Sequence, residues 1–379
     1  MLPVSTLPES AVVSFASSAG VDLHKCTVSL DAVDPLGKSI ARLTCSTKCV
    51  EKIDAFLAVL PRPSHLAVEA VGFVEWFIDR FRGSVDRIEI ADATRLSDLR
   101  GKRRKTDRND AHDIAVRLAR GDCPLGFVAP EEVMQLRKLG RHWRCLSRSL
   151  SRAKHSMSSI LLAANLKGPT LDGAGAQRWL LAHGHLLKDA QRDAFGDFVD
   201  LIELLERKRG VLKRKIIQAN GSERFDGLIT ILRSVPGIDH IWACIIASEI
   251  GDFARFPNAD ALEFWAGMTP DNLTSAGRTT SGHITKAGNA TLRWALCKAG
   301  VTLCRSDAKQ EAIRQRLIAK IGKPRANVAM GRRLLRILYA MVRDGSLYQG
   351  QVKTGHEAKA NIVRLKKIQR VKEGQMQTV

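Results

Sequence analysis

The sequence predicts a mixed fold, in which an α/β domain is followed by two groups of helices. Three observations predict it: strands and helices alternate in the first 125 residues, two long helical seams follow, and apolar helices dominate after residue 226. Hydrophobic residues make up 45% of the 379, which is enough for sizeable cores and excludes a wholly disordered chain. We therefore expect four segments, 1–125, 126–225, 226–345 and a basic tail over 346–379.

The first segment opens with three short strands and then alternates strands with helices. Period-two patterns mark the strands, and turn residues such as those at Asp34-Pro35-Leu36-Gly37 separate them. In chain order we expect strands over 20–22, 26–30 and 38–45, a helix over 50–60, a strand over 65–68, a helix over 72–81 and a strand over 85–90. A three-strand meander followed by this alternation is the order of an RNase H-like fold, which we predict here.

The second segment has the spacing of a coiled coil. Apolar residues recur every three or four positions over 136–160 and again over 195–216, with a Gly/Pro-containing break at 167–175. The two helices are expected to pack antiparallel, or each to pair with another copy of the chain in a homo-oligomer, a dimer or a tetramer; an ordinary helical hairpin is the alternative. One basic stripe lies beside the first seam, formed by Arg137, Arg141, Arg144, Arg148 and Arg152.

The third segment is predicted to be a compact helical domain. Residues 233–239, followed by an apolar helix over 241–250, resemble a helix–hairpin–helix turn, which offers backbone N–H groups to a phosphate. A loop rich in Gly, Thr and Ser is expected over 267–288, then a helix over 290–304 and a basic helix over 326–342. The basic tail is expected to bind nucleic acid.

The charge of the chain narrows its function. Lysine and arginine total 60 against 39 acids, a formal charge of +21, which points to a polyanionic partner. No apolar run reaches the ~18 residues that a membrane span needs, and the first 20 residues lack the basic start of a signal peptide. Cys45 and Cys49 are not followed by a second Cys/His pair at zinc-finger spacing. We expect a cytoplasmic protein that binds nucleic acid and no membrane.

Four carboxylates form the first candidate site. Asp22 and Glu69 end two expected strands, and Asp107 and Asp110 lie three apart at an expected helix start. Four convergent carboxylates repel one another unless divalent cations lie between them, and Mg²⁺ prefers such oxygen ligands. Two Mg²⁺ ions ~4 Å apart stabilise both oxygens of a phosphodiester displacement. For each acid alone, a solvated or helix-capping role is the alternative.

Basic residues next to this set would hold a polyanion against the acids. Among the basic residues around Asp107, those expected to bind nucleic acid are Arg103, Arg104 and Lys105. A second candidate site is the loop over 269–289, where small residues allow close approach and hydroxyl groups supply nucleophiles. Its phosphate-neutralising residues would be Arg278, Lys286 and Arg293. A flexible surface loop is the alternative there.

These motifs together resemble those of a known family. From Gly20 to about Val342 the chain is similar to the DEDD-type insertion-sequence transposases related to the pilin-gene-inverting recombinases. The order of six motifs carries the resemblance: Gly20-Val21-Asp22, Val68-Glu69-Ala70, Lys105-Thr106-Asp107-Arg108-Asn109-Asp110-Ala111, Ser234-Val235-Pro236-Gly237-Ile238, Gly267-Met268-Thr269-Pro270 and Gly282-His283-Ile284-Thr285-Lys286-Ala287-Gly288-Asn289.

The resemblance implies a specific chemistry. It implies a RuvC-like N-terminal domain whose acids Asp22, Glu69, Asp107 and Asp110 bind Mg²⁺, and a C-terminal transposase domain that supplies a nucleophilic serine. The family's motif reads Ser-Ser-Gly-Gly where this chain has Thr274-Ser275-Ala276-Gly277, so the nucleophile falls on Ser275.

Ser281 is the reserve candidate for that nucleophile. The resemblance also implies a structured bridge RNA that pairs with donor and target DNA, in the nucleoid of a bacterial cell. The expected function is excision and insertion of a mobile element by Mg²⁺-assisted serine strand exchange.

Two other functions fit the residues. A metal-dependent nuclease or junction resolvase would use the four acids with water as nucleophile, so Ser275→Ala would still cut DNA. A non-catalytic nucleic-acid-binding protein would lose no activity on Asp107→Ala.

Overall fold

The computed structural model describes residues 14–69, 72–93, 95–96, 107–169, 171–219, 223–275 and 278–350; of 107–108, 223–224, 271–275 and 278–283 it describes the backbone alone. It divides into two compact units, residues 1–128 and 129–379, which are taken in turn. Within the described ranges, no helix combines the length and the apolar character that a membrane crossing requires.

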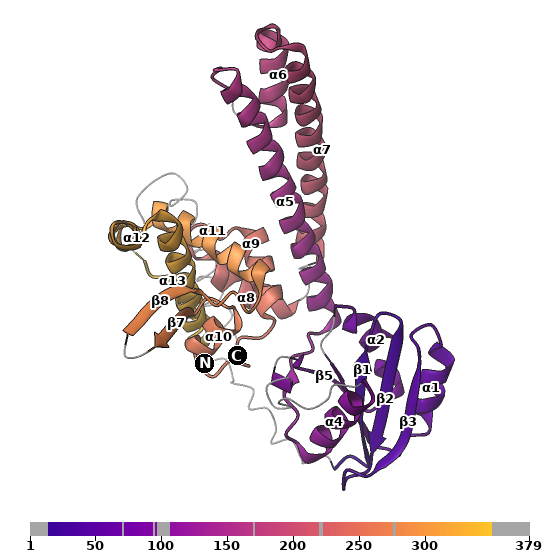
Figure 1. The fold of residues 1–379 in the computed structure, drawn as a ribbon. Coiled ribbons are helices and arrows are strands. Elements are labelled where there is room, and N and C mark those ends of the chain that lie inside the picture. Colours follow the sequence, from indigo (N-terminus) through magenta and orange to yellow (C-terminus); the bar gives the residue numbers. More distant parts are fainter. Residues whose placement is uncertain are drawn as a thin grey trace, which may run out of the picture. The chain divides into compact units, whose positions relative to one another are not determined.

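The N-terminal unit contains a six-stranded mixed sheet (Figure 1). The strand order is β3-β2-β1-β4-β5-β6, in which β1, β2 and β3 are antiparallel, β4 and β5 run parallel to β1, and β6 is antiparallel to β5. The strands are β1 Ser17–Leu23, β2 Thr27–Val33, β3 Ser39–Ser46, β4 Ser64–Glu69, β5 Arg87–Ala91 and β6 Leu125–Gly126. The predicted meander and strand–helix alternation are therefore present.

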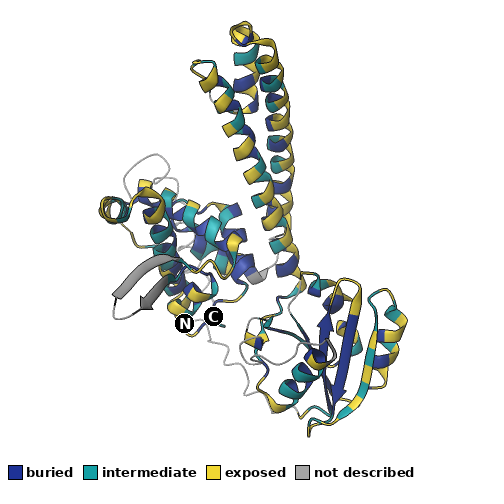
Figure 2. Cartoon of the chain, viewed as in Figure 1, coloured by how far each residue is buried: buried dark blue, intermediate teal, exposed yellow. Residues whose placement is uncertain are grey.

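One face of this sheet is apolar. Alternate residues of β1 and β2, such as Val21, Leu23 and Leu30, are buried beneath the helices α1 (Val50–Ala58) and α2 (Val74–Phe81). Figure 2 shows buried residues running along the central strands. Burial of this face is the main source of stability of the unit.

Helix α4 (Asp107–Arg120) packs on the opposite face of the sheet. A Cβ atom on Gly20 would collide with the carbonyl oxygen of Ala111 and lie 2.6 Å from the backbone nitrogen of Ala115. Glycine at position 20 therefore lets the α4 backbone rest directly on β1. The contact holds the start of α4 beside the carboxyl-terminal end of β1.

The C-terminal unit begins with an arm of two long helices (Figure 1). Helices α5 (Glu131–Ala163) and α7 (Asp189–Ala219) pack along each other in opposite directions. The predicted seams are largely buried; on α5 these residues are Leu136, Trp143, Leu150, Ala153 and Met157. Intrachain antiparallel packing is one of the two expected arrangements, and pairing with a second copy stays a prediction. The break between the seams contains a helix that sequence analysis missed, α6 (Gly173–His183).

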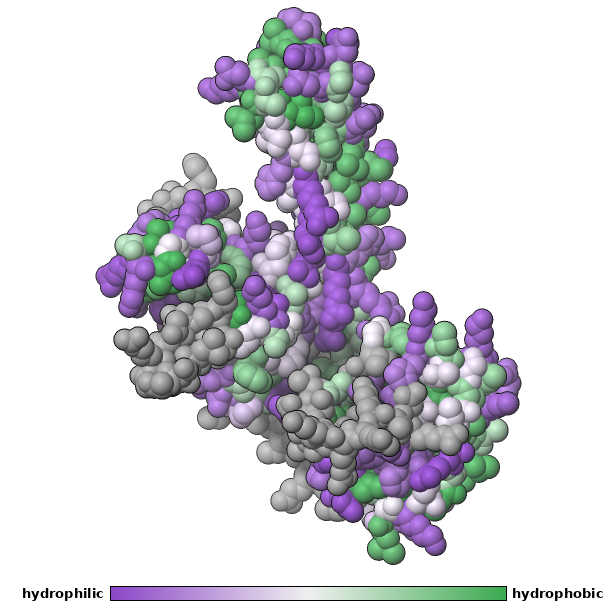
Figure 3. Space-filling view, viewed as in Figure 1, coloured by the Kyte–Doolittle hydropathy of each residue, from purple (hydrophilic) through white to green (hydrophobic). Residues whose placement is uncertain are grey.

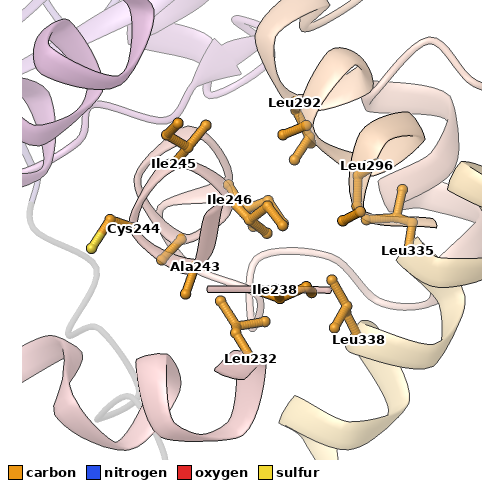
Figure 4. Packing of buried hydrophobic residues seen from close by; sticks show 14 of the residues in the cluster. Leu232, Ile238, Ala243, Cys244, Ile245, Ile246, Leu292, Leu296, Leu335 and Leu338 are labelled. Carbon is orange, nitrogen blue, oxygen red and sulfur yellow. The ribbon is translucent and has the colours of Figure 1, made fainter. Parts of the chain in front are cut away.

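Within the described residues, further helices complete this unit. They are α8 Glu223–Arg233, α9 His240–Ile250, α10 Ala259–Trp265, α11 Ala290–Ser306, α12 Ala308–Ile321 and α13 Lys323–Arg343. Ile246 of α9 packs among Leu296 of α11 and Leu335 of α13 (Figure 4). The base of the arm, including Leu136 and Trp143, belongs to the same apolar cluster. The base of the arm therefore packs with the helical core inside the unit over 129–379, and the expected boundary between the second and third segments stays a prediction.

A β-hairpin interrupts these helices where a loop was expected. Strands β7 (Pro270–Ser275) and β8 (Arg278–Ile284) pair antiparallel, with Ser275 opposite Arg278 at the tip. The physical reason is the run of β-branched threonines at 274, 279 and 280, which favours extended pairing despite the loop-like composition.

Candidate functional site

Two predicted acids lie side by side at one edge of the N-terminal sheet. Strands β1 and β4 are parallel, and Val21 is opposite Val68. Asp22 is the residue after Val21, and Glu69 is the residue after Val68. This register therefore places the two acids on neighbouring strands with their side chains on the same face. Neighbouring strands lie ~4.8 Å apart, which brings the two carboxylates within reach of a shared cation.

Asp110 of α4 approaches the same edge. Asp22 is two residues beyond Gly20, so its side chain points to the face that α4 covers. Asp110 directly precedes Ala111, whose carbonyl oxygen abuts Gly20. Both aspartates are nearly buried, with 4% of Asp22 and 5% of Asp110 exposed. The structure thus brings three of the four predicted acids to one edge.

The fourth acid, Asp107, begins α4 one helical turn before Asp110. The structure describes only the backbone of Asp107. Among the described residues, no group of three or more His, Cys, Asp or Glu has the spacing of a metal site. Carboxylate oxygens at a buried edge are the donors that Mg²⁺ prefers, so the residue types fit the ion, and its binding stays a prediction.

The face beneath α4 carries further acids that sequence analysis missed. Asp31 of β2, which is opposite Gly20, accepts a hydrogen bond from Ser39 Oγ at 2.8 Å and lies 2.6 Å from Arg42 Nε. It also lies 3.2 Å from Nδ1 of His112 on α4. This ion pair ties α4 to the sheet two residues after Asp110. The signal was the polar residue at 31 between apolar neighbours, which places it on the face of Asp22.

Histidines neighbour the acids of this face. His24 Nε2 lies 3.1 Å from Oδ2 of Asp22, and His65 Nε2 lies 2.7 Å from Oε2 of Glu89. The hydrogen bond to His65 lowers the pKa of Glu89. Of the basic residues expected near the acids, Arg103, Arg104 and Lys105 lie outside the described residues.

The candidate nucleophiles lie on the hairpin of the C-terminal unit. Ser275 ends β7 at the tip, and its cross-strand neighbour is Arg278. This register pairs a serine position with an arginine position at the tip of the hairpin. The reserve candidate, Ser281, is opposite Asn272, nearer the base.

The base of the hairpin is fixed to α10 and α11. The amide of Thr285 donates to the carbonyl of Thr269 at 3.1 Å, and that of Lys286 donates to Gly267 at 3.2 Å. Gly288 allows this close approach, because a Cβ atom there would collide with the carbonyl oxygen of Trp265. The hairpin therefore projects from a rigid base.

A buried carboxylate joins this base to the arm. Glu249 of α9 is 1% exposed; it accepts hydrogen bonds from Arg141 Nε at 3.0 Å and Nη2 at 3.1 Å, and one from Asn289 Nδ2 at 2.7 Å. Asn289 also caps α11 by accepting from the amides of Thr291 and Leu292. Arg137 Nε lies 3.6 Å from the same carboxylate. Sequence analysis did not identify Glu249, because an acid inside an apolar helix carries no motif.

These contacts divide the predicted arginine stripe. Arg137 and Arg141 face Glu249, and Arg144 donates to Thr291 Oγ1 at 3.3 Å. Arg148 and Arg152 are exposed. Arg293 likewise donates to the carbonyl of Ala266 at 3.0 Å. Three members of the stripe therefore make contacts within the chain, and nucleic-acid binding by the stripe stays a prediction.

The turn that resembles a helix–hairpin–helix lies between α8 and α9. Asp239 caps α9 by accepting from the amide of Trp242 at 2.9 Å. Gly237 has a φ of 92°, and a Cβ atom there would lie 2.8 Å from Cβ of Thr302 on α11. The turn packs closely on α11, and its binding of phosphate stays a prediction.

Two family models match the chain. The DEDD transposase model of the IS110 type matches residues 19–165, and the model described as Transposase IS116/IS110/IS902 family matches residues 229–315. The first range includes all four predicted acids, and the second includes Ser275.

Relatives carry similar names. A probable family 20 transposase of Pseudomonas aeruginosa is 25% identical over 347 residues, which cover 88% of this chain and 98% of the relative. The insertion element IS110 uncharacterized 43.6 kDa protein of Streptomyces coelicolor is 28% identical over 135 residues, 35% of this chain and 33% of that protein. A putative transposase of Sinorhizobium fredii is 25% identical over 202 residues, 53% of this chain and 49% of the relative. Together these findings support a transposase of the IS110/IS116 family.

Proposed function

From the premise that this chain is a DEDD transposase of the IS110/IS116 family, we propose that it excises and inserts a mobile element by using Ser275 as the nucleophile. The position of Ser275 supports the proposal: it ends β7 at the tip of a hairpin with a fixed base, opposite Arg278. An arginine at the paired position supports the proposal, because guanidinium groups bind phosphate oxygens.

The chemistry requires no external energy source. The Oγ of Ser275 attacks a DNA phosphorus atom and forms a P–O bond while the bond from phosphorus to one deoxyribose oxygen breaks. The serine proton leaves to a base, and the released deoxyribose oxygen takes up a proton. Attack by the hydroxyl of another strand reverses these changes, so the number of phosphoester bonds is conserved.

The acid edge supplies the second part of the proposed site. Asp22, Glu69, Asp107 and Asp110 would hold Mg²⁺, which when bound stabilises negative charge on the reacting phosphate. The burial of Asp22 and Asp110 on the face that α4 covers supports this role, because Mg²⁺ prefers carboxylate oxygens as ligands.

The partners follow from the same proposal. Donor and target DNA are the substrates, a structured bridge RNA selects them by base pairing, and the charge of +21 suits both polyanions. A homo-oligomer is supported by apolar side chains exposed at the far end of the arm, where Leu162 is 81% and Leu181 is 79% exposed.

The experiment compares Ser275→Ala with Ser281→Ala. Purified variants are given guide RNA and DNA carrying the element ends, and recombinant joints are counted. Ser275→Ala is expected to lose strand exchange and to keep normal DNA binding, whereas Ser281→Ala keeps both. DNA cutting that persists in Ser275→Ala would instead favour a nuclease that uses water.

A further inference from the structure

We propose that Arg144, Arg148, Lys286 and Arg293 form a binding site for one backbone phosphate of the DNA at the base of the hairpin. The existence of the site is independent of the nucleophile; its role, which is to set where the DNA lies relative to Ser275, rests on the function proposed above.

The four residues come from three segments that meet at the start of α11. Arg144 of α5 donates to Thr291 Oγ1, and Arg148 follows one helical turn later. Arg293 lies two residues beyond Thr291 and donates to the carbonyl of Ala266. The amide of Lys286 donates to the carbonyl of Gly267, the next residue after Ala266. These contacts place the four basic residues in one neighbourhood.

Glu249 offsets their positive charge only in part, because it raises the pKa of Arg144 less than the other effects lower it. Glu249 is already bound by Arg137, Arg141 and Asn289. Burial lowers the pKa of Arg144, and the neighbouring charges of Arg148 and Arg293 lower it further. Like charges gathered in this way favour the binding of an anion.

Arg144 also carries a nitrogen, Nε, that can donate a hydrogen bond to a phosphate oxygen. Its Nε is buried and has no hydrogen-bond partner among the described residues. Buried donors are nearly always satisfied in folded proteins, and a guanidinium binds phosphate oxygens in a fixed geometry. Arg148 and Lys286 are exposed, so the site opens to solvent. Figure 3 shows hydrophilic side chains gathered on the part of the arm nearest the helical core.

The distance from this site to Ser275 suggests its role. Five strand steps separate Pro270 from Ser275, which at ~3.3 Å each amounts to about 17 Å. Phosphates of one strand are spaced ~3.4 Å along a duplex axis, so DNA lying along the hairpin would place a phosphate at the hairpin base about five base pairs from the one attacked. Contacts with the backbone fix position without reading sequence.

The test measures DNA binding in a Ser275→Ala background, so that cleavage does not interfere. The double variant Arg148→Gln/Lys286→Gln changes two exposed side chains, and the matched control Arg178→Gln/Lys208→Gln removes the same charge from the arm. Each is titrated with a 30-base-pair duplex and with a single-stranded RNA of equal length between 50 and 200 mM salt. The slope of log K against log salt is expected to fall by about 1 for the duplex in the double variant and to remain unchanged in the control.

An unchanged slope for the duplex, an equal change in the control, or a change for RNA alone would overturn the proposal. A second measurement uses the native protein: Cys145 is exposed three residues before Arg148, so duplex DNA is expected to slow its alkylation. Alkylation at the same rate with and without DNA would also contradict the site. If instead the slope falls while Ser275→Ala still recombines, the nucleophile is wrong and the phosphate site stands.

Discussion

At the scale of single residues, glycines explain two of the motifs. Gly20 lets α4 rest on β1, and Gly288 lets the hairpin base approach α10. In both places the neighbour is backbone, which does not move aside as a flexible side chain would. Motifs that look catalytic thus also contain residues whose role is to let two elements approach.

Gly20→Ala tests this role in the N-terminal unit. The added methyl group would push α4 off β1, so the free energy of unfolding is expected to fall by about 1–3 kcal/mol in urea titrations. Gly72→Ala is the control, because a Cβ atom there meets nothing within 4 Å. Equal stability of Gly20→Ala and Gly72→Ala would show that the close contact has no energetic weight.

At the scale of elements, the Glu249–Asn289 hydrogen bond couples α9 to the start of α11. Asn289→Asp places two carboxylates against each other and should cost about 1–3 kcal/mol of stability. Adding Glu249→Gln restores a donor and an acceptor with their roles reversed, and Asp at 289 still caps α11. The double variant is therefore expected to be more stable than Asn289→Asp alone in urea titrations. A double variant less stable than either single one would mean that the pair is not coupled.

The acid edge joins β1, β4 and α4 and makes its own prediction. Mg²⁺ that binds the folded state is expected to stabilise it by about 2.7 kcal/mol at a concentration of 100 times Kd. The melting temperature should therefore rise. Asp110→Asn is expected to lose most of this increase, because it removes one of the proposed carboxylate ligands. An equal rise in melting temperature for the native chain and for Asp110→Asn would show that Asp110 does not bind the metal.

The long helices could be predicted from periodicity, because the seams of α5 and α7 bury one side of a regular pattern. Strands β1 and β4 are buried on both faces, and they could be predicted as short apolar runs bounded by turn residues. Helix α6 could not. Its Gly173 and Gly175 look like a break, yet both are buried and a Cβ atom on Gly173 would collide with Glu203 of α7. Packing between helices thus outweighs the low helix propensity of glycine.

The candidate site could be predicted only in part, because several of its contacts join residues that are distant in sequence. The placement of Asp22 and Glu69 at the ends of neighbouring strands could be predicted from the order of the strands, whereas their grouping with Asp110 into a metal site stays a prediction. The partners Asp31, His112 and Glu249 act through contacts between residues distant in sequence, which no local spacing reveals.

At the scale of the whole molecule, the acids belong to the N-terminal unit and the serine to the C-terminal unit. A reaction that needs both would make either unit inactive alone. This also explains how two family models, matching 19–165 and 229–315, describe one activity.

The most direct measurement is the identity of the residue that becomes linked to DNA. The native chain, guide RNA and DNA are mixed, denatured during the reaction and digested, and the nucleotide-carrying peptide is sequenced by mass spectrometry. The account predicts a phosphodiester on Ser275 that is absent from Asp110→Asn and retained in Ser281→Ala. Strand cleavage without any protein–DNA linkage, or a linkage on a different residue, would contradict it.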